Sequence, residues 1–250
     1  MNHYEGNIED ALSKHDIEAV WEWLEHGGNP RHITEYGDSL LHIATLNDNT
    51  DATKLLLDVG VDPNNRNAED LTPICYASKA ETIIMLHEYG ASLTVEDGNY
   101  GPPLHRAACS LSVEAVTTMV ALGADIYAEP SDGGLPAIYN SFLSDNCKAM
   151  LLAFISMGFS VDGIEGHPLL HYAYGSDRLE AVELLLKLGA DPTLKDDNGR
   201  DFEAFKEMVK ERRKAANSQS VETERKVNPL LEELEKQLVE TARLKEELNN

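Results

Sequence analysis

The sequence is poor in cysteine, and its apolar runs are short. Its three cysteines, Cys75, Cys109 and Cys147, stand far apart and form no CxxC pair. This spacing argues against a disulfide framework and favours a reducing compartment, so we expect a cytoplasmic protein. No apolar run reaches the roughly 20 residues that a membrane span needs, and the acidic stretch 1–10 lacks the form of a signal peptide. We therefore expect no membrane association.

Sequence strings typical of catalytic sites are also missing. GxGxxG, P-loop, GxSxG and HExxH patterns do not occur, so nothing in the sequence predicts nucleotide binding, a serine nucleophile or a zinc protease. His167 and His171 lie four residues apart without another cysteine or histidine nearby, and they stay unassigned. We expect no enzyme, no cofactor and no metal site.

Positive charge is scarce and unevenly spread. The chain has 44 acidic residues against 21 Lys and Arg, for a net charge of −23. Residues 1–200 hold 32 of the acids and only 11 of the bases. A surface of this kind repels nucleic acid and anionic lipid and speeds the encounter with a cationic protein. The charge therefore predicts a basic protein partner and argues against nucleic acid and membranes.

What the sequence does contain is an internal repeat, marked by turn glycines that follow apolar amphipathic runs. The glycines recur at intervals of 33, 30, 33, 35 and 31 residues, at Gly27, Gly60, Gly90, Gly123, Gly158 and Gly189. The end of a helix favours glycine because it adopts positive φ without strain. A period of this length predicts stacked helix pairs.

A second signature precedes each amphipathic run. It reads Ser39-Leu40-Leu41-His42, Thr72-Pro73-Ile74-Cys75, Pro102-Pro103-Leu104-His105, Leu135-Pro136-Ala137-Ile138 and Pro168-Leu169-Leu170-His171. These segments resemble the Thr-Pro-Leu-His motif of ankyrin repeats. The resemblance implies that the first residue caps a short helix, that the leucine enters the core, and that the histidine bridges backbone groups of neighbouring repeats. One repeat of separation is too far for these histidines to share a metal.

The resemblance predicts an all-α repeat solenoid with short β-hairpin fingers over residues 1–213. A capping unit would occupy about 7–32, five repeats would start near 33, 67, 97, 130 and 163, and a terminal cap would occupy about 196–213. The polar stretch 214–228 reads as a linker. Residues 229–250 predict a charged amphipathic helix whose apolar stripe is too interrupted for a strong coiled coil, so a monomer is favoured over a homo-oligomer.

Aligning the repeats brings two sets of residues into register. The position after the histidine slot, on the inner helix, holds Ile43, Tyr76, Arg106, Tyr139 and Tyr172, and Phe142 follows one turn later. The fingers hold Tyr36 and the acids Glu35, Asp38, Glu69, Asp132, Glu165 and Asp197. Tyrosine and arginine are typical of interface hot spots, although the same aromatic residues could simply be core packing.

These patterns favour a non-enzymatic binding module that binds a basic protein through its inner helices and acidic fingers. A concrete version is an immunity-like or antitoxin-like inhibitor of a basic enzyme. An adaptor or effector scaffold that tethers its partner without inhibiting it stays open. A structural protein that self-assembles through the C-terminal helix also stays open.

Overall fold

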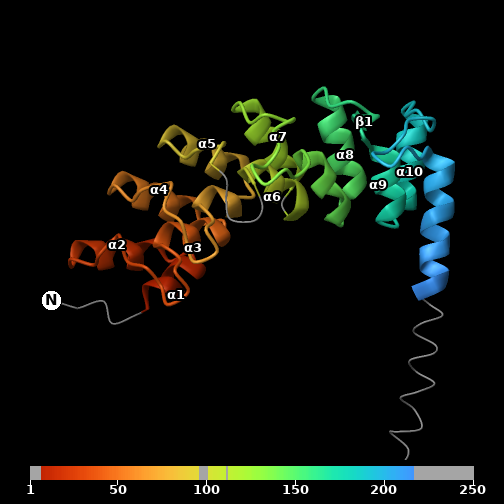
Figure 1. Cartoon of the computed structure of the whole chain (residues 1–250). Helices are drawn as coiled ribbons and strands as arrows, with labels where there is room; N and C mark the ends of the chain where they lie inside the picture. Colours follow the sequence, from red (N-terminus) through yellow and green to blue (C-terminus); the bar gives the residue numbers. More distant parts are fainter. Residues whose placement is uncertain (1–6, 96–100, 111, 217–250) are drawn as a thin grey trace, which may run out of the picture. The chain divides into compact units, whose positions relative to one another are not determined.

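The computed structural model describes residues 7–95, 101–110 and 112–216, and it divides into two compact units, Met1–Asp191 and Pro192–Asn250. The first unit consists of short helix pairs that follow one another along the chain (Figure 1). None of the described helices is long and apolar enough to cross a lipid bilayer.

Each helix pair has an inner and an outer member. The inner helices are α1 (Ile8–Ser13), α3 (Leu40–Leu46), η1 (Pro73–Tyr76), α6 (Pro103–Ser110), η2 (Ala137–Leu143) and α9 (Leu169–Gly175). The outer helices are α2 (Ile17–Glu25), α4 (Thr50–Asp58), α5 (Ala80–Glu88), α7 (Val113–Ala121), α8 (Cys147–Ser156) and α10 (Leu179–Lys187). Inner helices contact inner helices of the next pair and outer helices contact outer ones. The predicted all-α repeat solenoid is confirmed.

Local sequence explains where these helices begin and end. Asp16, Asn49 and Ser112 each accept a hydrogen bond from a backbone N–H in the first turn of an outer helix, which satisfies a donor that the helix leaves free. The glycine that follows each outer helix has a positive φ, for example +85° at Gly60 and +104° at Gly123. In the shortest repeat the inner helix is only a four-residue 3-10 turn, η1.

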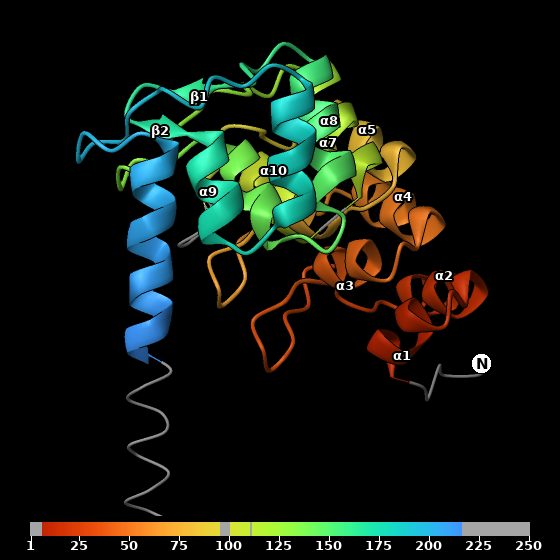
Figure 2. The same ribbon diagram turned by 90° about the vertical axis from the view of Figure 1, so that its right-hand side faces the viewer.

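The finger segments join each outer helix to the next inner helix. The fifth finger contains the strands β1 (Gly163–Ile164) and β2 (His167–Pro168), which pair antiparallel, and Figure 2 shows them beside α9. Histidines tie fingers to helices as the resemblance implies. The Nε2 atom of His42 lies 2.9 Å from the carbonyl oxygen of Leu71, and that of His105 lies 3.2 Å from the carbonyl oxygen of Leu135.

The second unit begins with a tight turn that an ion pair closes. The Asp196 N–H donates to the carbonyl oxygen of Arg200, and the Arg200 guanidinium lies 2.7 Å from the Asp196 carboxylate. Residues 202–216 are helical. From residue 217 on, the linker predicted for 214–228 and the helix predicted for 229–250 lie outside the described residues.

Candidate protein-binding surface

The finger acids lie at the surface, as their positions in turns suggest. Glu35, Glu69, Asp132 and Glu165 are all exposed. Within the described part of the chain, none of these four carboxylates pairs with a cation. Because such carboxylates recur in the first, second, fourth and fifth fingers, this edge of the first unit carries uncompensated negative charge.

Among the finger residues that the structure describes, Tyr36 is the most exposed aromatic one, with 73% of its surface accessible. It lies beside Glu35 in the first finger, where Ile33 is also 48% exposed. An aromatic ring that contributes little to the fold and lies next to a free carboxylate offers both apolar area and charge to a partner.

Three of the predicted residues meet in one cluster across neighbouring repeats. The Asn67 amide donates to Asp38 Oδ1 at 2.7 Å and to the Tyr76 hydroxyl at 2.9 Å. The Arg106 guanidinium lies 4.9 Å from the centre of the Tyr76 ring, a distance typical of a cation–π contact. Partial burial raises the pKa of Tyr76. The sequence pattern missed Asn67, because a finger asparagine reads only as a turn residue.

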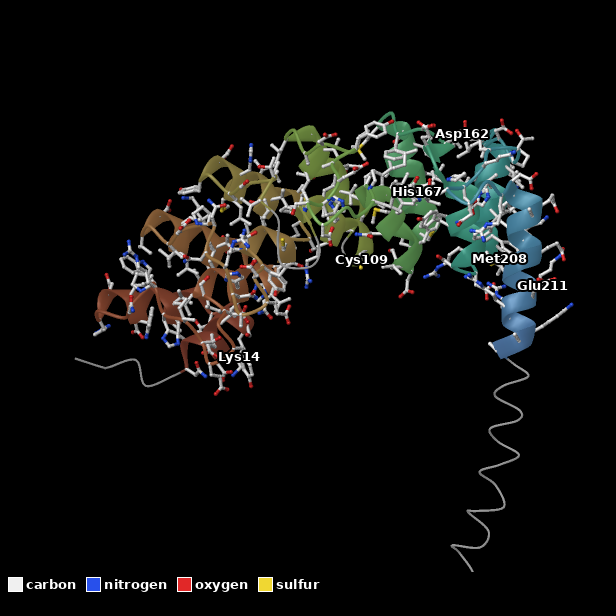
Figure 3. All side chains as sticks on the ribbon, viewed as in Figure 1. Lys14, Cys109, Asp162, His167, Met208 and Glu211 are labelled. Atoms are coloured by element: carbon white, nitrogen blue, oxygen red, sulfur yellow. The ribbon has the colours of Figure 1, made fainter. Side chains whose placement is uncertain are left out.

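Tyr139 and Tyr172 form a second cluster. Their rings contact edge to face with centres 4.7 Å apart. The Tyr139 hydroxyl donates to the carbonyl oxygen of His167 at 2.5 Å and accepts from the N–H of Ile164 at 3.1 Å. The Tyr172 hydroxyl lies 3.1 Å from Nδ1 of His167, a finger residue labelled in Figure 3.

Burial separates the predicted inner-helix residues into two classes. Tyr139 and Phe142 are only 6% and 3% exposed, and burial raises the pKa of Tyr139 well above its usual value. Tyr76, Arg106 and Tyr172 are half-buried and keep part of their surface in water. Tyr139 therefore joins its repeat to the next one, and Phe142 belongs to the core. Neither side chain offers much surface to a partner.

In residues 7–95, 101–110 and 112–216, no group of three or more His, Cys, Asp and Glu side chains lies close enough together to hold an ion. His42 is buried, and its pKa is lowered because burial disfavours the charged ring. The surface therefore presents exposed carboxylates together with half-exposed aromatic and guanidinium groups.

Comparison with known proteins agrees with this architecture. A family model of three ankyrin repeats matches residues 8–97 and 41–130, and a single ankyrin repeat matches residues 165–197. The human ASB11 ankyrin repeat domain is similar in structure, with a TM-score of 0.69 and 23% identity, and the match covers 80% of this chain and 91% of that one. At that identity the likeness concerns the fold alone.

Two curated relatives are much longer proteins. The transient receptor potential channel pyrexia of Drosophila melanogaster is 25% identical over 177 residues, which cover 71% of this chain and 17% of that protein. The tyrosine-protein kinase HTK16 of Hydra vulgaris is 32% identical over 118 residues, which cover 45% of this chain and 15% of that protein. The chain thus spans less than a fifth of the length of either relative.

Proposed function

Because the chain belongs to the ankyrin-repeat family, we propose that its repeats bind a basic protein through the acidic fingers and the inner helices. Ankyrin repeats are protein–protein interaction modules whose stacked units create an extended binding surface. The proposal that the partner is basic rests on one observation: the carboxylates of Glu35, Glu69, Asp132 and Glu165 are exposed and form no ion pair with the described residues.

The half-exposed residues of the inner helices would supply the short-range contacts. Tyr76 and Tyr172 combine apolar area with a hydroxyl that is already positioned by Asn67 and His167. Ordering these side chains in advance lowers the entropy lost when a partner binds. The exposed Tyr36 extends the same surface to the first finger.

The concrete form of the proposal is an inhibitor that covers the functional site of a basic enzyme. An acidic surface of this kind competes well with the anionic substrate that a basic enzyme binds. The proposal also places the protein in a cytoplasmic, reducing compartment, where Cys75, Cys109 and Cys147, which form no disulfide, stay reduced.

A photo-crosslinking experiment tests the binding surface. Tyr36 would be replaced by p-benzoylphenylalanine in the full chain. A control chain would carry the same group in place of Trp21, which is 53% exposed on α2. We expect position 36 to capture a protein with a net positive charge, and position 21 to capture little of it. Equal capture from both positions, or capture of acidic proteins, would contradict the proposal.

The captured protein then distinguishes inhibition from tethering. Its activity would be titrated with the full chain at low salt. A loss of activity that reaches a plateau at stoichiometric addition supports the inhibitor. Tight binding without loss of activity assigns the chain to the adaptor class and rejects the inhibitory version.

A further inference from the structure

A pocket of about 750 Å³ opens between the first turns of α8 and α10, two helices that lie side by side in Figure 2. Its lining comes from the two turns that join an inner helix to its outer helix, namely residues 145–149 and 177–181, together with Leu152. None of the finger acids contributes to it. Its volume falls within the range of sites that hold ligands of several hundred daltons.

The lining of this pocket combines apolar side chains with charged ones. Ala181 is 1% exposed and Cys147 is 6% exposed. Two large side chains from neighbouring helices, Leu152 at 44% and Leu179 at 55%, remain in water at the mouth. A single exposed leucine is ordinary, but two leucines that border one pocket form an apolar patch that a binding partner would cover.

The sequence around the pocket departs from the pattern of the other repeats. The second residue of each of the other five outer helices is acidic: Glu18, Asp51, Glu81, Glu114 and Glu180. In α8 this residue is Lys148. A cation in the first turn opposes the helix dipole, so this choice costs stability locally. Such departures are expected where function constrains the sequence.

Both cations of the lining, Lys148 and Arg178, already have partners within the repeats. Lys148 Nζ lies 3.3 Å from Glu180 Oε2, in an ion pair that joins α8 to α10. The Arg178 Nε–H donates to the carbonyl oxygen of Phe142 at 2.9 Å. Asp145 is exposed, and with the described residues it forms neither a hydrogen bond nor an ion pair. The lining as a whole holds three carboxylates, those of Asp145, Asp177 and Glu180, against the two cations, so its net charge is −1.

From this combination we propose that the pocket binds a partner segment in which a bulky apolar side chain stands next to a lysine or arginine. The apolar side chain enters between Leu152 and Leu179, and the neighbouring cation pairs with Asp145. An acidic segment would meet the free carboxylate of Asp145 and is disfavoured. The site shares a cationic partner with the proposed function but uses none of the finger residues, so either proposal can fail alone.

The test uses the full chain, labelled at leucine methyl groups for NMR, and three capped tetrapeptides. The probe is Lys-Phe-Leu-Lys, and the two matched peptides are Glu-Phe-Leu-Glu and Lys-Ser-Gly-Lys. We expect the probe to shift the methyl signals of Leu152 and Leu179 in a saturable way. The acidic peptide should bind at least about tenfold more weakly, because it loses the attraction to Asp145. The peptide without apolar side chains should leave both signals in place.

Two pairs of variants assign the binding to the pocket. Leu179→Glu removes an apolar wall, and its control Leu186→Glu changes a residue that is 44% exposed on the same helix but outside the lining. Asp145→Lys reverses the charge at the mouth, and its control Glu183→Lys makes the same change of net charge on an exposed residue of α10. Both pocket variants should bind the probe peptide with an affinity that is lower by about tenfold or more. Both controls should bind it as the unaltered chain does.

Several results would overturn the proposal. One is that the probe peptide causes no saturable shift of the methyl signals. Another is that the acidic peptide, or the peptide without apolar side chains, binds as tightly as the probe. The last is that Leu179→Glu binds the probe as tightly as the unaltered chain. Circular dichroism checks that each variant is folded. A second variant repeats the test at the other leucine: Leu152→Glu should lower the affinity for the probe peptide as Leu179→Glu does. Crosslinking from position 36 in the Leu179→Glu chain reports on the finger surface separately.

Discussion

The Tyr139 hydroxyl donates a hydrogen bond of 2.5 Å to the main-chain oxygen of His167, which lies in the finger of the next repeat. The same oxygen of Tyr139 accepts from the N–H of Ile164. One side chain of η2 therefore holds both strands of the fifth finger. The contact joins residues 28 positions apart in the sequence, and it makes Tyr139 a link between repeats.

The first prediction concerns this link. Tyr139→Phe keeps the ring but removes the hydroxyl, so two part-buried backbone groups lose a partner. We expect the free energy of unfolding to fall by about 1–3 kcal/mol, as measured by urea denaturation. Tyr36→Phe is the control, because Tyr36 is 73% exposed and should change the stability by less than about 0.5 kcal/mol. Equal stability of the two variants would show that the finger does not depend on the hydroxyl.

The second prediction is a pH dependence that comes from His42. Burial lowers the pKa of His42 below 6.5, although the carbonyl oxygen of Leu71 and the carboxylate of Asp38 oppose the shift. The unfolded chain therefore binds a proton at this ring before the folded chain does. The free energy of unfolding should fall as the pH drops from 6.5 toward the folded-state pKa, and His42 should contribute no pH dependence above the unfolded value.

The comparison that isolates this contribution is with His42→Gln. The variant is less stable throughout, because it loses the bridge to Leu71. Its stability should nevertheless decline less steeply between pH 6.5 and 5, by at most about 1.4 kcal/mol per pH unit. Parallel curves for the two chains over this range would show that the folded state tolerates the charged ring.

The third prediction concerns a helix cap supplied by the neighbouring repeat. Lys79 precedes α5 without a side-chain cap of its own, and the N–H of Ala80 instead donates to Glu114 Oε1 at 3.0 Å. Glu114→Ala should therefore lower the stability by about 1 kcal/mol and speed hydrogen exchange at the Ala80 amide. Glu180 occupies the same position of α10 but pairs with Lys148 in an exposed ion pair. Glu180→Ala should cost no more than about 0.5 kcal/mol.

Comparing Tyr76 with Tyr139 shows what could be predicted from the sequence. Turn glycines and the histidine slots predicted the repeat fold, because these signals depend on a few neighbouring residues. Whether the side chain that follows a histidine slot is buried depends on the side chain that it meets in the next repeat, about 30 residues away. Tyr76 faces the long side chain of Arg106 and stays half-exposed, whereas Tyr139 faces the ring of Tyr172 and is buried. Aromatic residues in two consecutive slots are a signal that could have indicated this packing.

The fourth prediction separates charge from contact area in the proposed binding surface. Exchanging Glu35, Asp132 and Glu165 for glutamine removes three exposed charges with little change of shape. We expect slower association with the captured basic protein and a nearly unchanged dissociation rate, because exposed charges mainly steer the encounter. The difference should shrink as salt rises through the range in which the Debye length falls below about 8 Å. An association rate that is unchanged at low salt would contradict the role of the fingers.

The fifth prediction concerns Tyr36, an exposed residue of the first finger. Its ring is 73% exposed, so Tyr36→Ala should leave helicity and stability unchanged. If the ring enters the interface, the variant should dissociate faster from the captured protein, by a factor that corresponds to about 1–2 kcal/mol. Trp21→Ala, which removes an exposed ring on α2, should leave the dissociation rate as it is. Unaltered dissociation in a folded Tyr36→Ala chain would move the contact away from the first finger, because a ring of this size that becomes buried must contribute to the affinity.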